Sequence, residues 1–140
     1  KRYAALADIV KLSEDEAFLL SGTADPAAAA AALAGPAALV AVTRGERGSV
    51  AFYRGKAIAA DTLKIEAIDT TGAGDAFYAA FLTEIARETA PTPETIRTAL
   101  TLGNAAGALT ATKKGAVAAL PAHATLRAAA AALARTDKAD

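Results

Sequence analysis

The residues best suited to chemistry lie in the stretch DTTGAGD at positions 69–75, directly before a helical pattern that starts at Ala76. The backbone N–H groups of Ala73, Gly74 and Asp75 are therefore expected to be the unpaired donors of a helix N-terminus. Glycine lets a ligand approach such a backbone closely, and the helix dipole favours an anion there. The sequence thus predicts a phosphate-binding site.

Asp75 requires a separate explanation, because a carboxylate among these donors would repel a bound phosphate. One explanation is a general base, which takes a proton from an attacking hydroxyl and must lie near the phosphoryl group without binding it. The alternative is that Asp75 only complements the helix dipole, which is worth about 0.3–1 kcal/mol. The local residues leave both roles open.

Two common phosphate-binding motifs are excluded. The chain has no GxxxxGK[ST] sequence, so it has no Walker A loop. Gly72-x-Gly74 begins like a dinucleotide fingerprint, but Phe77 stands at the third glycine position, and no strand ending in an acid follows about 20 residues later. The pattern disfavours a Rossmann dehydrogenase.

Composition narrows the functional class. The 140 residues include 15 basic and 15 acidic side chains, so the formal net charge is zero and a nucleic-acid partner is not expected. Without cysteine there is no disulfide or thiol nucleophile, which fits a cytoplasmic location. No apolar run approaches the roughly 20 residues of a membrane-spanning helix, so no membrane partner is expected.

The length corresponds to one domain, residues 1–140, but its core is expected to be thin. Alanine supplies much of the 54% hydrophobic content, and it buries little apolar area per residue. The chain also contains no methionine. We therefore expect a piece of a longer protein that relies on neighbouring structure for burial.

Hydrophobic periodicity and capping signals predict alternating strands and helices. Strands are expected at 7–12, 38–43, 49–53 and 56–59, the last two as a hairpin around Arg54-Gly55, and a further extended stretch at 63–68. Helices are expected at 13–22, 25–35, from 76 to Pro91, at 92–112 and at 122–134. This alternation predicts an α/β fold with a mostly parallel sheet and one β-hairpin.

Other candidate residues are less informative. His123 has no cysteine or acid nearby and is predicted to be a surface residue. Phe77 and Phe81 form a core stripe on their helix. Lys113 and Lys114 are expected at a solvated helix end, with contact to ATP phosphates as the alternative.

Four segments, in order, resemble the signature segments of the ribokinase-like (PfkB) carbohydrate kinases: 9–16 (IVKLSEDE), 42–49 (VTRGERGS), 69–77 (DTTGAGDAF) and 104–115 (NAAGALTATKKG). The resemblance implies the C-terminal portion of a three-layer α/β/α domain, the portion that carries the ATP side. The KLSxxE and VTRG forms are most similar to fructokinase-type members.

By position, the resemblance implies roles for individual residues. Asp75 matches the catalytic base, and Gly72, Ala73 and Gly74 match the anion hole for the transferred phosphoryl group. The positions that match the binding of ATP are Thr43, Gly45 and Gly48 beside the phosphates, with Asn104 near the adenine and Gly107 on the same helix face.

Metal sites are implied in the same way. Asp69 and Thr71, with backbone groups near Thr110, Lys113 and Gly115, match positions that hold a monovalent cation such as K⁺. Glu16 matches the acid that organises Mg²⁺ and water. Ser13 stands where the family usually has Asn, and a capping box accounts for Ser13 and Glu16 without any metal; the two roles can coexist.

The implied activity is ATP-dependent phosphorylation of a sugar hydroxyl, with fructose the leading substrate. The N-terminal half that supplies the family's sugar pocket is not among these residues, so the chain alone is expected to be inactive. Two alternatives are a non-catalytic nucleotide-binding module and an interaction fragment whose exposed sheet edge drives self-association. Binding of Mg·ATP and phosphorylation of a sugar would distinguish the three.

Overall fold

The computed structural model describes residues 6–34 and 38–136. The chain divides into two compact units: Lys1–Gly45 with Ser49–Ala59, and Glu46–Gly48 with Ala60–Asp140. The predicted stop of the second helix at Gly35-Pro36 lies outside the described residues.

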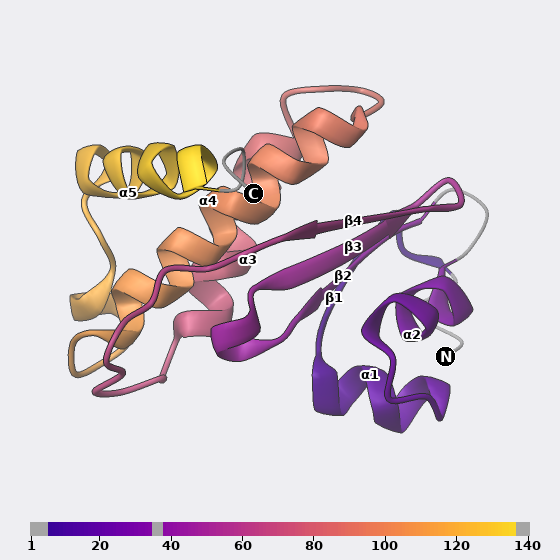
Figure 1. Cartoon of the computed structure of the whole chain (residues 1–140), viewed down its shortest axis with the longest axis horizontal. Coiled ribbons are helices and arrows are strands. Elements are labelled where there is room, and N and C mark those ends of the chain that lie inside the picture. The colour runs from indigo at the N-terminus through magenta and orange to yellow at the C-terminus, as the bar shows by residue number, and fades with distance from the viewer. Residues whose placement is uncertain (1–5, 35–37, 137–140) are drawn as a thin grey trace. The chain divides into compact units, whose positions relative to one another are not determined.

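The first unit is built on a sheet with the strand order β1-β2-β3-β4 (Figure 1). The strands span Ile9–Ser13 (β1), Leu39–Thr43 (β2), Ser49–Tyr53 (β3) and Lys56–Ala60 (β4). β1 runs parallel to β2, whereas β3 pairs antiparallel with β2. The hairpin turns at Arg54-Gly55, where both residues have positive φ, as a tight two-residue turn requires. The sheet was predicted to be mostly parallel. It is mixed, because the hairpin strand β3 pairs antiparallel with β2.

Two short helices, α1 (Glu14–Ser21) and α2 (Pro26–Leu33), pack on one face of this sheet (Figure 1). α2 starts where predicted, because the Asp25 side chain accepts the Ala27 N–H and Pro26 occupies the first turn. Between helices and sheet, small side chains such as Ala29 and Ala30 meet Val40 and Val42. The core of this unit thus contains few large side chains, as the alanine content predicted.

The second unit is helical. It contains α3 (Ala73–Ile85), α4 (Pro93–Ala111), the short 3-10 turn η3 (Val117–Ala119) and α5 (His123–Thr136). The bounds of α4 and α5 lie within two residues of the prediction. The predicted end of α3 at Pro91 is wrong: the helix ends at Ile85, because the N–H groups of Arg87 and Glu88 donate to the carbonyls of Glu84 and Ile85 and tighten the chain into a turn. α3 packs along α4, and α5 packs on α4 (Figure 1). Phe77 and Phe81 are buried and stacked, with ring centroids 5.8 Å apart, which confirms the predicted core stripe.

Segment 61–72 leads to α3. Residues 63–68, predicted to be extended, belong to no helix or strand and are mostly exposed. The segment is tied to the end of α4, where the Ile68 N–H donates to the Ala111 carbonyl at 2.8 Å. No helix in the described part of the chain is long and apolar enough to cross a membrane.

Candidate active site

The start of α3 is shaped by a glycine. Gly72 occupies the N-cap position with φ +78°, a left-handed conformation that side chains disfavour, and no side chain caps the helix. A Cβ on Gly72 would lie 2.8 Å from the Cβ of Ala116. Both the backbone conformation and the close approach of the 115–116 loop therefore require glycine at this position.

The N–H groups of this helix end are only partly free. The Ala73 N–H donates to the Thr70 carbonyl at 3.1 Å, so the prediction of an unpaired Ala73 donor is wrong: the residues before the helix form a turn that uses it. Within the described residues, no hydrogen bond occupies the N–H groups of Gly74 and Asp75. The Asp75 side chain is exposed in the same turn. The site thus offers two donors and one carboxylate.

Asp69 joins the loop before α3 to the loop after α4. Its Oδ1 accepts the Thr71 N–H at 3.0 Å, and its Oδ2 accepts the Gly115 N–H at 2.9 Å. These hydrogen bonds, led by that from Gly115, lower the pKa of Asp69 to about 2. A negative charge therefore lies where segment 69–71 meets Gly115, and the cation site there stays a prediction.

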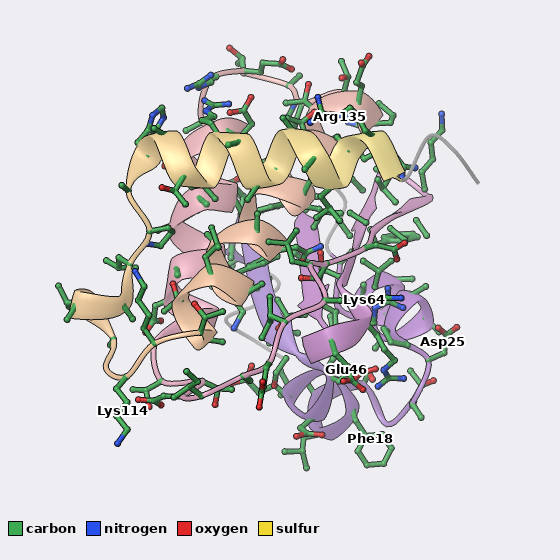
Figure 2. All side chains as sticks on the ribbon, turned by 60° about the vertical axis from the view of Figure 1, so that its left-hand side comes forward. Phe18, Asp25, Glu46, Lys64, Lys114 and Arg135 are labelled. Atoms are coloured by element: carbon green, nitrogen blue, oxygen red, sulfur yellow. The ribbon has the colours of Figure 1, made fainter. Side chains whose placement is uncertain are left out.

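The main-chain groups near Asp69 that were predicted to border a cation make hydrogen bonds of their own. The Gly115 N–H donates to Asp69, and the carbonyl of Thr110, at the C-terminal end of α4, accepts the Lys113 N–H at 3.3 Å. Lys113 and Lys114 are exposed, and the Lys114 side chain points away from the ribbon (Figure 2). The described residues contain no group of three or more His, Cys, Asp or Glu side chains that could hold a metal.

Asn104, predicted to lie near an adenine, is buried and makes main-chain contacts. Its Nδ2 donates to the carbonyls of Ala60 (3.0 Å) and Asp61 (2.8 Å). Gly48 approaches the same Ala60 carbonyl so closely that a Cβ on Gly48 would lie 2.2 Å from its oxygen. Asn104 therefore holds the segment against which the Gly48 turn packs, and its Oδ1 makes no hydrogen bond within the described residues.

Gly107 lies at the crossing of α4 with α3, where a Cβ would be 3.1 Å from the Ala73 carbonyl oxygen. Sequence reasoning missed Gly103, one turn earlier, where a Cβ would lie 2.8 Å from two ring carbons of Phe77. The spacing of Gly103 and Gly107, four residues apart on one helix, was the signal that could have revealed a close helix contact.

The remaining predicted residues lie in the first unit. Ser13 and Glu16 form the capping box: the Ser13 N–H donates to Glu16 Oε2 at 2.7 Å, and the Glu16 N–H donates to Ser13 Oγ at 3.3 Å. The bond from the Ser13 N–H lowers the pKa of Glu16.

The strand register places the other predicted residues of this unit near Ser13. Ser13 stands opposite Thr43 in the parallel pair, and the Thr43 Oγ1 donates to the Leu12 carbonyl. An exposed turn at Gly45 follows Thr43. The three residues Glu16, Thr43 and Gly45 thus lie at or just beyond the carboxyl ends of two parallel strands, where ligands bind in open α/β sheets.

Comparison with known proteins places this chain in a family. The sequence profile described as pfkB family carbohydrate kinase matches residues 1–123. A fructokinase of Salmonella thompson is 40% identical over 119 residues, which are 83% of this chain and 54% of the relative. Probable fructokinase-4 of Arabidopsis thaliana is 35% identical over 119 residues, 82% of this chain and 36% of the relative.

Solved structures agree on the fold. The crystal structure of fructokinase from Vibrio cholerae O395, with fructose, ADP and calcium ion bound, matches with a TM-score of 0.81 and 36% identity over 91% of this chain and 42% of that chain. Ribokinase from Thermotoga maritima matches with a TM-score of 0.75 and 28% identity, covering 89% and 42%. The chain thus spans only part of the length of these proteins. It has a ribokinase-like α/β fold and belongs to the pfkB family of carbohydrate kinases.

Proposed function

We propose that this chain carries the ATP side of a sugar kinase, which transfers a phosphoryl group from ATP to a sugar hydroxyl. The observation that carries the proposal is the first turn of α3, where an exposed Asp75 carboxylate accompanies the N–H groups of Gly74 and Asp75 that no side chain caps. A general base and an anion site in one turn are what in-line phosphoryl transfer to a hydroxyl needs.

In this proposal Asp75 accepts the proton of the sugar hydroxyl as its oxygen attacks. The glycine-rich turn Gly72–Gly74 lets the backbone approach the transferred group, whose negative charge the two free N–H groups and the helix dipole stabilise. Donors aimed at developing charge are effective because they need no reorganisation during the reaction.

ATP supplies the phosphoryl group. The residues proposed to bind it are Thr43, Gly45 and Gly48 beside the phosphates, with Asn104 and Gly107 toward the adenine.

Glu16 is proposed to orient water on a phosphate-bound Mg²⁺. Its Oε2 accepts the Ser13 N–H, whereas its Oε1 has no hydrogen bond within the described residues and is available to accept one from such a water. Asp69 and Thr71, with main-chain oxygens of the 110–115 loop, are proposed to hold a monovalent cation such as K⁺, which suits the low pKa of Asp69.

Fructose is the proposed substrate, supported by the fructokinases among the relatives and by the fructose-bound structure from Vibrio cholerae. Because the chain covers 42% of that structure, we propose that residues outside this chain supply the sugar pocket and that the chain alone is inactive.

The test uses two proteins, the isolated chain and the complete gene product that contains it. Calorimetric titration of the chain with Mg·ATP measures nucleotide binding, and a coupled ADP-release assay of the complete product with fructose, ribose and no sugar measures transfer. We expect the chain to bind Mg·ATP without turnover and the complete product to release ADP only when sugar is present.

Each other result points to a different function. ATP binding without sugar phosphorylation by the complete product would support a non-catalytic nucleotide-binding module. No ATP binding by either protein, with concentration-dependent association of the chain in analytical ultracentrifugation, would support an interaction fragment.

A further inference from the structure

A contact between α4 and α3 excludes a side chain at Gly103. A Cβ there would lie 2.8 Å from Cδ2 and Cε2 of Phe77 and 3.1 Å from the Phe77 carbonyl oxygen, whereas ordinary contacts begin at 3.4 Å. The Phe77 ring has no room to withdraw, because it is 3% exposed and stacks on the fully buried Phe81. The close packing of Phe77 of α3 therefore requires glycine at position 103 of α4.

The same turn of α3 receives a second glycine contact. A Cβ on Gly107 would lie 3.1 Å from the Ala73 carbonyl oxygen and 3.7 Å from Phe77 Cβ. The two glycines of α4 thus support residues 73–77 of α3, the turn that contains Gly74 and Asp75. Asp75 and Phe77 are two residues apart and so point to nearly opposite sides of the helix, one exposed and one buried.

Gly103 itself is buried and has no functional group, so any effect on a reaction must act through Phe77. We propose that Gly103 is a positioning residue: its missing side chain lets Phe77 pack against the α4 backbone, and this packing sets the position of Gly74 and Asp75. The proposal rests on the kinase function proposed above.

The size of the effect follows from the geometry. Alanine at 103 must move Phe77 from 2.8 Å to at least 3.4 Å, and in a close-packed core that shift passes to the backbone. A 1 Å misplacement of reacting groups can cost about 100-fold in rate, so we expect a roughly tenfold loss of kcat. Alanine has a higher helix propensity than glycine, so a loss cannot be assigned to weakening of α4.

The experiment measures kcat and the KM values for ATP and sugar in the complete gene product. Its variants are Gly103→Ala, Phe77→Leu, the double variant and, as a control at an exposed position of the same helix, Thr98→Ala. We expect Gly103→Ala to lower kcat about tenfold with the KM for ATP changed less than twofold, and Thr98→Ala to retain wild-type kcat. Adding Phe77→Leu removes the two ring atoms at 2.8 Å but leaves the carbonyl contact at 3.1 Å, so the double variant should recover part of the lost kcat.

An unchanged kcat in Gly103→Ala overturns the proposal, and so does a loss that Phe77→Leu does not recover. If Gly103→Ala does not fold, Gly107→Ala replaces it. Its contact at 3.1 Å requires a smaller shift, so a smaller loss of kcat is expected. Because Gly107 is also proposed to lie toward the adenine, kcat is measured at saturating ATP, and an unchanged kcat again refutes the proposal.

A second measurement separates this proposal from the kinase function. In the isolated chain, the NMR amide resonances of Gly74 and Asp75 should shift in Gly103→Ala and return toward wild type in the double variant. An inactive wild-type product with these shifts would refute the kinase function and leave the packing relation supported. An active wild-type product without them would refute the positioning role.

Discussion

The N-termini of α1 and α3 begin in different ways, although an acid occupies the third position of each helix. In α1 that acid, Glu16, folds back to accept the Ser13 N–H, and Ser13 accepts the Glu16 N–H in return. In α3 the acid is Asp75, the N-cap is Gly72, and no side-chain hydrogen bond closes the helix end. One helix therefore uses its acid for its own stability, and the other leaves its acid available to a ligand.

The difference has an energetic meaning. A side-chain N-cap is typically worth about 1 kcal/mol, and α2 and α4 carry one as well, from Asp25 and Thr92. Among these four helices only α3 lacks this stabilisation. Residues that function in binding commonly forgo local stability in this way, so the comparison predicts that a change of the acid Asp75 in α3 affects activity and that loss of the cap Ser13 of α1 affects stability.

The largest expected effect is that of Asp75→Asn in the complete gene product. The amide keeps the size of the side chain but cannot accept the hydroxyl proton, so kcat should fall by about 10²–10⁴-fold. The melting temperature should change little, because Asp75 is exposed. Steady-state kinetics check the prediction, with Asp15→Asn, an exposed acid in the first turn of α1, as the control that retains activity. Near-normal turnover of Asp75→Asn would contradict the role of general base.

The second prediction compares two glycines with the same backbone conformation. Gly22, which ends α1, has φ +82° with nothing within 4 Å of a Cβ, whereas Gly72 has φ +78° with Ala116 at 2.8 Å. Alanine in the left-handed region costs about 1–2 kcal/mol, which is all that Gly22→Ala should lose. Gly72→Ala must also displace the 115–116 loop and should lose more. Urea unfolding of the isolated chain measures both variants, and equal losses would show that the loop yields without cost.

The third prediction concerns acid stability. Hydrogen bonds from Gly115 and Thr71 lower the pKa of Asp69 to about 2 in the folded chain, against about 3.9 for an unperturbed aspartate. The folded state therefore favours the ionised carboxylate, and its contribution is fully present above pH ~4 and is lost as the pH falls toward ~2. Unfolding free energies measured between pH 5 and pH 2 should fall less steeply for Asp69→Asn than for wild type. Parallel curves would contradict the hydrogen-bonded carboxylate.

These comparisons also show what the sequence could predict. Capping residues act within four positions of their helix, so Ser13, Asp25 and Thr92 marked three helix starts correctly. The hairpin followed from Arg54-Gly55 for the same local reason. The antiparallel pairing of β2 with β3 was not predicted, because the order of strands depends on contacts between distant segments.

In the candidate site, too, the features set by neighbouring residues were predictable and those set by distant contacts were not. The glycine-rich turn before α3 was predictable from local physics, but the hydrogen bond that occupies the Ala73 N–H depends on the turn that Thr70 adopts. The donors of Asn104 go to the carbonyls of Ala60 and Asp61, more than 40 residues away, and local reasoning gives no sign of that contact. The hydrogen bond from the Ile68 N–H to the Ala111 carbonyl at the end of α4 is likewise a contact between distant segments, which local sequence patterns do not predict.

The smallest expected effects are at the N-terminus of α1, where two roles of Glu16, helix capping and the proposed orientation of Mg²⁺-bound water, can be separated. Ser13→Ala removes the Oγ that accepts the Glu16 N–H and should destabilise the chain by about 1 kcal/mol. Glu16→Gln keeps an oxygen that can accept the Ser13 N–H, because a capping box tolerates Gln, so the stability should change by only about a few tenths of a kcal/mol.

Glu16→Gln also removes the charge proposed to orient Mg²⁺-bound water, so in the complete gene product it should raise the Mg²⁺ concentration needed for half-maximal rate. Titration of the rate with Mg²⁺, beside urea unfolding of both variants, tests the two roles together. A wild-type Mg²⁺ dependence in Glu16→Gln would leave capping as the sole role of this carboxylate, and α1 would then differ from α3 in function as completely as it differs in its cap.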